Sequence, residues 1–135
     1  MADTRLQPPE GEILMTVDII QGVRTLNRTL MRYQLPIEIT ENGCSYGDVP
    51  DAKGVVPDDR RIAFFRGYLG AVARAHKAGI PIRAYNAWSL MDNYEWAEGY
   101  SQRFGFIFVD FRTLQRTVKE SGKWYAQLAA TGKLS

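Results

Sequence analysis

The sequence predicts an α/β fold built around a parallel strand–helix–strand unit. Three observations carry this prediction: a β-favouring run at residues 36–41, a helical pattern that starts at Asp58, and a second β-favouring run from Pro81 to Trp88. Two strands of one sheet that are joined through a long helix run parallel, and such crossovers are right-handed. With 135 residues, the chain has the length of one ordinary domain.

The composition disfavours several classes of function. Hydrophobic residues make up 45% of the chain and charged residues 24%, which is typical of a globular domain with a buried core. Lys and Arg number 17 against 15 Asp and Glu, and they are scattered along the chain, which disfavours a nucleic-acid partner. No apolar run suits a transmembrane helix and the first residues do not resemble a signal peptide, so we expect no membrane association and a cytoplasmic location.

Metal and redox chemistry are disfavoured as well. The chain has one cysteine, Cys44, and one histidine, His76. A single cysteine cannot form an internal disulfide, and these two residues cannot supply the ligands of a structural zinc site. We therefore expect no metal and no cofactor, and a packing role for both side chains.

The first part of the chain is expected to lead into the first strand. Residues 1–15 show no sustained period and predict an extended lead-in to one structural segment, residues 16–135. From about Val17, apolar residues recur at helical spacing, which predicts an amphipathic helix that ends before Pro36. The run at residues 36–41 follows as a strand.

The end of that strand is marked by a turn-prone pair, Asn42 and Gly43, so the strand is expected to end at Glu41. The next stretch, up to Pro57, is rich in Gly, Pro and Asp and predicts a long loop. Loops of about a dozen residues usually carry function or are mobile.

The clearest helix starts after this loop. Asp58 is expected to cap it, Gly79 to end it, and Pro81 lies just beyond. One apolar face is expected to consist of Ile62, Phe65, Leu69, Val72, Ala73 and His76.

The last third of the chain predicts one more strand and one more helix. The apolar run at residues 104–109 is strand-like. The spacing of Thr117 and Glu120 matches a capping box, which predicts a final helix that includes Trp124 and Tyr125.

Two strand ends concentrate residues that suit a sugar ligand. In parallel α/β folds, ligands bind where the carboxyl ends of the strands meet. The first strand places Glu41 at its tip, and the segment from Trp88 to Trp96 adds two indoles and the carboxylates of Asp92 and Glu95. The C–H groups of a sugar ring stack on indoles, and its hydroxyls donate hydrogen bonds to carboxylates.

The strings at these strand ends identify a family resemblance. They are Ile39-Thr40-Glu41-Asn42-Gly43, AWSLMDNYEW at residues 87–96, GYSQRFG at 99–105 and VDF at 109–111. Together they closely resemble the C-terminal part of the family 1 glycoside hydrolases, the β-glucosidase family. The resemblance runs in order from roughly residue 35 to residue 125, about two thirds of the chain.

The resemblance implies that the fold is the C-terminal part of a (β/α)8 TIM barrel. A complete barrel takes about 250 residues, and only elements matching its last two strands with their flanking helices are visible here. The Asn-Glu-Pro motif that carries the family's acid/base glutamate does not occur in the chain. We therefore expect a split, nicked or truncated enzyme that pairs with a complementary N-terminal fragment.

The resemblance also implies the roles of the site residues. The family hydrolyses β-glucosides with retention, through a covalent glycosyl-enzyme intermediate, and its nucleophile corresponds to Glu41. Glu95 would accept hydrogen bonds from distal sugar hydroxyls and Trp96 would donate one, while Trp88 would form a stacking floor and Phe104 would complete the sugar site. The acid and indole at positions 95 and 96 favour a neutral glycone over a phosphorylated one.

Other interpretations of the same residues stay open at this stage. Without the resemblance, Glu41 is an ordinary acid beside a turn, and the two indoles are core or partner-facing aromatics. Glu95 is a candidate ion-pair partner of Arg103, and Phe104 is a candidate packing residue. The competing function is a non-catalytic carbohydrate-binding or assembly fragment.

Overall fold

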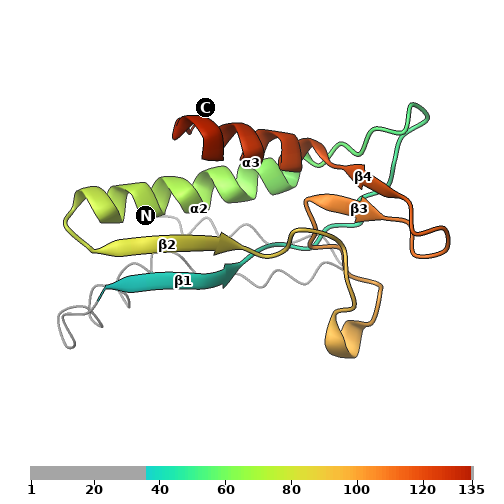
Figure 1. The fold of residues 1–135 in the computed structure, drawn as a ribbon, viewed down its shortest axis with the longest axis horizontal. Coiled ribbons are helices and arrows are strands. Elements are labelled where there is room, and N and C mark those ends of the chain that lie inside the picture. The colour runs from blue at the N-terminus through green and yellow to red at the C-terminus, as the bar shows by residue number, and fades with distance from the viewer. Residues whose placement is uncertain (1–35, 135) are drawn as a thin grey trace, which may run out of the picture.

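The computed structural model describes residues 36–134 (Figure 1). The expectations for residues 1–15 and for a helix starting near Val17 lie outside the described residues.

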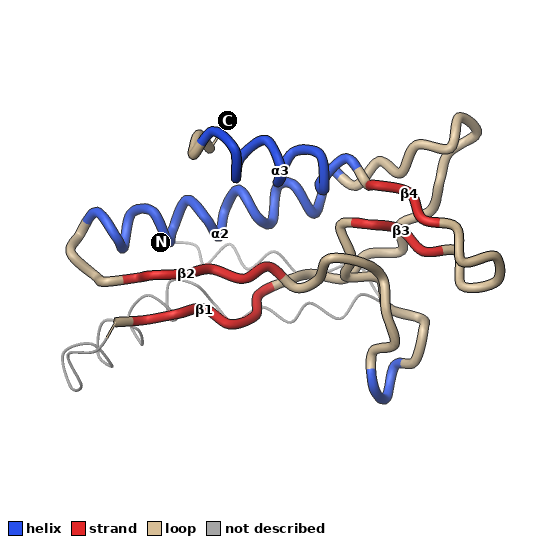
Figure 2. The backbone as a smooth tube through the Cα atoms, viewed as in Figure 1, coloured by secondary structure: helices blue, strands red, loops and turns tan. Residues whose placement is uncertain are grey.

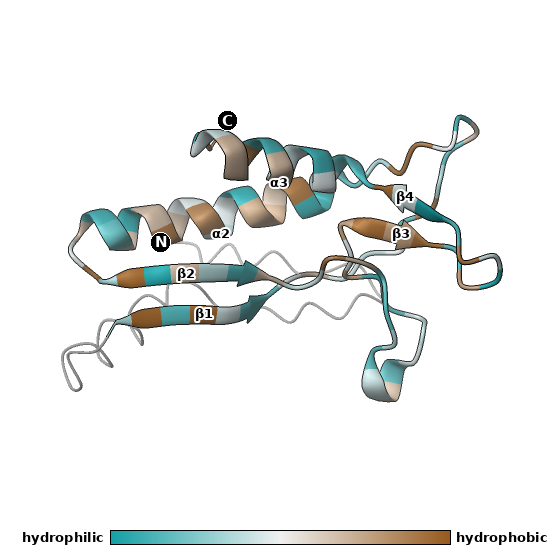
Figure 3. Ribbon diagram, viewed as in Figure 1, coloured by the Kyte–Doolittle hydropathy of each residue, from teal (hydrophilic) through white to brown (hydrophobic). Residues whose placement is uncertain are grey.

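The predicted strand–helix–strand unit is present and its strands are parallel. Strand β1 (Ile37–Asn42) pairs with β2 (Ile82–Ala87), with Ile37 opposite Ile82. Apolar and polar residues alternate in the first part of each strand, as the hydropathy colouring shows (Figure 3). This period of two is typical of strands whose faces meet different surroundings. The two carboxyl ends therefore lie at the same edge of the sheet.

Helix α2 (Asp59–Lys77) connects these strands and contacts β2 (Figure 1). Its predicted start is correct, but the predicted capping role of the Asp58 side chain is wrong. That carboxylate makes no capping bond and instead accepts hydrogen bonds from the backbone and hydroxyl of Ser121 and from Arg61. In the described part of the chain His76 is exposed, so the packing role predicted for it is also wrong.

The last third of the described chain forms a hairpin and a helix. Strand β3 (Ile107–Val109) is shorter than the predicted run at residues 104–109, and it pairs antiparallel with β4 (Arg116–Val118), which was not predicted. Helix α3 (Glu120–Thr131) follows directly. The predicted capping box is wrong because its first residue, Thr117, lies in β4, and Lys119 occupies the N-cap position without a side-chain capping bond.

Aromatic side chains join the two helices to the segment before β3. The Phe65 ring on α2 lies 5.0 Å from the Phe106 ring, and the Tyr125 ring on α3 stacks on Phe106 with a centroid distance of 4.7 Å. Phe65 and Phe106 are buried. This packing holds α3 against α2 on the side of the molecule away from β1 (Figure 2).

The described residues contain two separate two-stranded sheets and no closed barrel. Within residues 36–134, β1 and β2 each pair only with the other, so each has one edge without a strand partner from this part of the chain. None of the described helices is both long and apolar enough to cross a membrane.

Candidate active site

The ends of β1 and β2 meet as the parallel pairing requires. The Trp88 backbone N–H donates to the Asn42 carbonyl at 2.8 Å, and the Tyr85 hydroxyl lies 2.6 Å from the Asn42 side-chain oxygen. Glu41 precedes Asn42 at the tip of β1. The two strand ends that the sequence singled out are therefore direct neighbours.

Gly43 is required at this junction because two backbones approach closely. A Cβ atom at this position would lie 1.9 Å from the carbonyl oxygen of Trp88. Gly43 is not among the described glycines with a positive φ, and β1 continues through Asn42. The strand therefore ends at this pair, one residue later than predicted, but the two residues form no turn, and close approach of the chain is the reason for the glycine.

The two strand ends line a pocket of about 260 Å³. It is lined by Glu41, Asn42, Gly43, Trp88, Glu95, Trp96 and Phe104. All five residues predicted for the sugar site are in this set, although they come from segments up to 63 positions apart. The pocket combines two carboxylates with two indoles and a phenyl ring.

Glu41 lies at the edge of this pocket with its side chain accessible. The residue is exposed, and within residues 36–134 its carboxylate has neither a hydrogen-bond nor an ion-pair partner. A carboxylate held at a strand tip in this way is accessible to a ligand in the pocket.

Glu95 is positioned by a short loop on the other side of the pocket. Its backbone N–H donates to the Gly99 carbonyl at 2.7 Å, across the 3-10 turn η1 (Trp96–Glu98). The carboxylate atom Oε2 of Glu95 is buried and has no hydrogen-bond partner within residues 36–134. A buried carboxylate oxygen without a partner loses its hydration without compensation, so it favours a ligand that donates a hydrogen bond.

The alternative role for Glu95 is wrong. Arg103 forms its ion pair with Asp92, at 2.6 Å, and not with Glu95. Trp96 beside Glu95 has a positive φ of 42° and is 82% exposed. Positive φ is uncommon for a bulky residue and is often found at functional sites. Phe104, by contrast, is buried, so it combines a place in the pocket wall with a packing role.

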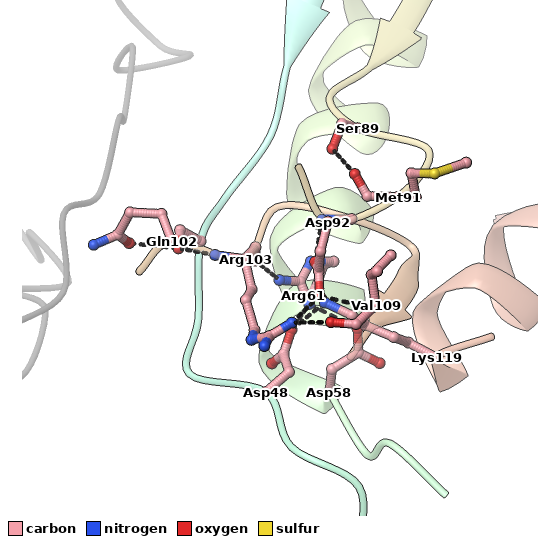
Figure 4. Close-up of polar contacts among 12 residues, drawn as sticks. Asp48, Asp58, Arg61, Ser89, Met91, Asp92, Gln102, Arg103, Val109 and Lys119 are labelled. Atoms are coloured by element: carbon pink, nitrogen blue, oxygen red, sulfur yellow. Dashed lines mark hydrogen bonds and ion pairs between the residues drawn. The ribbon is translucent and has the colours of Figure 1, made fainter. Parts of the chain in front are cut away.

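A cluster of buried charges lies beside the two strand ends (Figure 4). It consists of three carboxylates and three cations, namely Asp48, Asp58, Asp92, Arg61, Arg103 and Lys119. Arg61 contacts both Asp48 and Asp58, and Lys119 lies 2.7 Å from Asp48 and 3.0 Å from Asp92. Charges that are this deeply buried are tolerated when they are paired and hydrogen-bonded.

Sequence reasoning did not find this cluster, because its members lie in five different segments and none follows a local motif. The pKa of Arg61 reflects its surroundings. Burial disfavours the charged guanidinium, but the carboxylates of Asp48 and Asp58 outweigh that effect and raise its pKa above the ordinary value.

Cys44 and the acidic residues offer no metal site in the described part of the chain. No group of three or more His, Cys, Asp or Glu side chains is arranged to hold an ion there. Cys44 is 1% exposed, and burial raises the pKa of its thiol to about 12. The thiol therefore stays protonated at neutral pH, as a small packing side chain does.

Comparison with known proteins gives a consistent result. The family model described as glycosyl hydrolase family 1 matches residues 7–134. A β-glucosidase of Agrobacterium sp. is 51% identical over 111 residues, which cover 81% of this chain and 24% of that protein. β-Glucosidase A of Thermotoga maritima is 42% identical over 110 residues, which cover 81% of this chain and 25% of that protein.

Solved structures agree with the sequence relatives. The β-glucosidase from Thermotoga maritima in complex with a methyl acetic acid-substituted glucoimidazole superposes with a TM-score of 0.81 at 39% identity. The same enzyme in complex with cyclophellitol gives the same values, and both matches cover 84% of this chain and 26% of the other. The chain thus spans about a quarter of the length of the relatives it matches.

Proposed function

Because this chain belongs to glycosyl hydrolase family 1, we propose that it supplies the nucleophile and most of the glycone pocket of a retaining β-glucosidase. The observation that carries the proposal is the pocket at the two strand ends. Its lining contains the exposed carboxylate of Glu41 and the buried Oε2 of Glu95, which has no partner among the described residues, together with Trp88 and Trp96.

The proposed reaction starts with Glu41. Its carboxylate attacks the anomeric carbon, the bond to the leaving oxygen breaks, and a glycosyl ester forms; water then cleaves that ester and regenerates the carboxylate. A second carboxyl group about 5–5.5 Å away must protonate the leaving oxygen and later take a proton from the water. This chain has no Asn-Glu-Pro motif, so we propose that a complementary barrel segment supplies that group.

Sugar binding is proposed to depend on the other pocket residues. Glu95 Oε2 accepts hydrogen bonds from sugar hydroxyls, which gives a buried acceptor the partner that it lacks among the described residues. The Trp96 indole N–H donates to a hydroxyl, and the Trp88 indole forms a floor for the ring. Phe104 closes the wall behind them. The substrate class is a neutral β-glucoside or a related sugar.

A chimera tests this proposal directly. In it, this chain replaces the matching region of the Agrobacterium β-glucosidase, so that the rest of a family 1 barrel surrounds it. The chimera is treated with a 2-deoxy-2-fluoro glucoside, which traps the glycosyl ester, and the labelled peptide is identified by mass. Label on Glu41 is the expected result.

Two outcomes would contradict the proposal. Label on Glu38, Glu95 or Glu98 would overturn the assignment of the nucleophile. A chimera that binds a glucoimidazole but hydrolyses no aryl β-glucoside and takes up no label would instead favour the competing function, a non-catalytic carbohydrate-binding or assembly fragment.

A further inference from the structure

The chain between the end of β2 and the start of β3 contains a loop that carries most of the predicted sugar-site residues. We call residues 93–104 the glycone loop, since they include Glu95, Trp96 and Phe104. The loop projects away from the sheets (Figure 1). Trp96, which lies in the turn η1, is 82% exposed and has a positive φ. The Tyr94 and Tyr100 rings contact each other with a centroid distance of 5.4 Å, but both residues are more than half exposed, so the outer part of the loop is packed only at the surface.

The two ends of the glycone loop are held tightly together. The Asp92 backbone N–H donates to the Ile107 carbonyl at 2.9 Å, and the Phe106 N–H donates to the Ser89 carbonyl at 3.0 Å. A Cβ atom on Gly105 would lie 2.1 Å from the Asp92 backbone nitrogen. Only glycine permits this approach, so the chain crosses itself at residues 92 and 105.

The Asp92 carboxylate stabilises this crossing by accepting hydrogen bonds. The side chain is fully buried and accepts hydrogen bonds from the Gly105 N–H at 3.0 Å and the Val109 N–H at 3.4 Å. It also accepts from Arg103 Nη1 at 2.6 Å and from Lys119 Nζ at 3.0 Å (Figure 4). One carboxylate therefore joins residues on both sides of the crossing to the start of α3.

Arg103, which lies in the glycone loop, connects the loop to the neighbouring segments. Its Nη1 also donates to the Val109 carbonyl at 3.0 Å, and its guanidinium lies 4.3 Å from the centre of the Phe108 ring. On the other side, the Arg103 carbonyl accepts from Arg61 Nη2 at 2.6 Å, and its N–H donates to the Ser45 hydroxyl at 3.0 Å. The C-terminal end of the loop is thereby tied to the segment that follows β1.

The same charges link the two strand ends. Lys119 Nζ contacts Asp48, in the loop after Glu41, as well as Asp92, in the loop after Trp88. Hydrogen bonds to charged groups are worth about twice as much as neutral ones. The cluster thus sets how the loop carrying Glu95 lies relative to the strand carrying Glu41.

We propose that Asp92 is a positioning residue of the sugar site. Its carboxylate holds the glycone loop in the conformation in which Glu95 and Trp96 face the pocket, without touching the sugar itself. The sugar part of this inference rests on the proposed function, but the ordering of the loop does not. The two can therefore be tested separately.

The test measures amide hydrogen exchange across the full chain, in the wild type and in Asp92→Asn. This change keeps the shape of the side chain and removes its charge. Exchange of residues 93–104 is expected to accelerate about ten- to a hundredfold, which corresponds to the loss of a charged hydrogen-bond acceptor. Amides in the middle of α2 are expected to change by less than that.

Asp110→Asn is the matched control, because Asp110 lies in the hairpin turn and accepts from the backbone N–H of Arg112 without joining the cluster. It should leave the glycone loop unchanged. Equal acceleration in the loop and in α2 would show that Asp92 only stabilises the fold, and would overturn the proposal. An unprotected loop in the wild type, or an unchanged loop in Asp92→Asn, would overturn it as well.

A second pair of variants keeps the proposal testable should Asp92→Asn fail to fold. Arg103 is less buried, with 18% of its side chain exposed. Arg103→Met should release the loop, whereas Arg103→Lys should restore most of the lost protection because it keeps a cation beside Asp92. Equal exchange in these two variants would contradict the role of the charge pair.

A separate titration of the chimera with a glucoimidazole distinguishes the two proposals. Weaker binding in Asp92→Asn, by about tenfold or more, is expected alongside the faster loop exchange. No binding even by the wild type would contradict the sugar site, while the exchange data would still decide the ordering role of Asp92. Faster loop exchange with unchanged glucoimidazole affinity would overturn the link between Asp92 and the sugar.

Discussion

Glu41 and Glu95 line the same pocket but have opposite surroundings. Glu41 is exposed at a strand tip, whereas the Oε2 atom of Glu95 is buried and has no hydrogen-bond partner in the described part of the chain. A nucleophile must reach the anomeric carbon, and a binding group gains most when it meets a hydroxyl in a site from which water is excluded. The two environments therefore suit the two roles proposed for these carboxylates.

Replacing Glu41 is expected to abolish turnover while leaving sugar binding in place. Glu41→Gln keeps the size and hydrogen-bonding capacity of the side chain but cannot form the glycosyl ester, so the loss falls on the covalent step. The measurements are kcat for an aryl β-glucoside and Kd for a glucoimidazole, both in the chimera. Glu38→Gln is the control, because Glu38 is an exposed carboxylate on the same strand. Wild-type turnover by Glu41→Gln would refute the assignment.

Replacing Glu95 is expected to weaken both the ground-state complex and the transition state. Hydrogen bonds to charged groups contribute about 1.5–3 kcal/mol each, so Glu95→Ala should lower kcat/KM at least tenfold. Steady-state kinetics of the chimera provide the measurement, with Glu98→Ala, an exposed acid in the same turn, as the control. Equal losses in the two variants would mean that the turn, and not the Glu95 acceptor, is responsible.

Cys44 gives a residue-scale prediction for pH dependence. Burial raises the pKa of the folded thiol from 9.0 to about 12. Between these values the unfolded chain loses the proton and the folded chain keeps it, so the free energy of unfolding falls as pH rises above 9.0. Urea titrations below and above that pH should show the fall, and Cys44→Ala should make it smaller. A fall of the same size in Cys44→Ala would assign it to other groups.

The five residues predicted for the sugar site could be named from the sequence because each lies in a string that resembles the family 1 glycoside hydrolases. Their roles remain predictions. The buried charges could not be named, because an isolated Asp or Lys in a sequence looks like a solvated surface residue. Asp58 illustrates the difficulty. Its position before a helix predicts a side-chain cap, yet its carboxylate accepts a hydrogen bond from Ser121, 63 positions away. Long-range pairing outweighed the local preference.

At the scale of elements, the two parallel strands were predicted from short β-favouring runs and α2 from apolar residues that recur at helical spacing. Strand β4 and the turn η1 have only three residues each, which is too short for a period to be recognised. The false capping box arose because Thr117 and Glu120 have the right spacing, but Thr117 pairs with Phe108 across the hairpin.

Gly43 provides the element-scale prediction. Gly43→Ala should destabilise the junction of β1 and β2, because the new Cβ atom would overlap the Trp88 carbonyl and the backbone would have to shift. Overpacking of this kind costs about 1–3 kcal/mol or more. The measurement is the free energy of unfolding, and Gly47→Ala is the control, since a Cβ atom there would meet nothing within 4 Å. Equal destabilisation by both variants would argue against the close approach.

At the scale of the whole molecule, the described residues form two separate sheets and no closed barrel. The chain covers about a quarter of those relatives, and β1 and β2 each have one edge that no described strand covers. Unpaired edges are ready to accept another strand. These edges are where we propose that strands of a complementary barrel segment pair with this chain.

This layout leads to a prediction about activity. The 135-residue polypeptide, purified without a partner, should hydrolyse an aryl β-glucoside negligibly, since Asn-Glu-Pro is absent and general acid catalysis alone contributes about 10²–10⁴-fold. Adding a separately produced barrel segment that carries this motif should raise the rate, and the rate should saturate as the two polypeptides associate. The same addition to Glu41→Gln should give no increase, because the covalent step is lost. Full activity of the chain alone would show that an acid within these 135 residues protonates the leaving group, and would refute the need for a complementary segment.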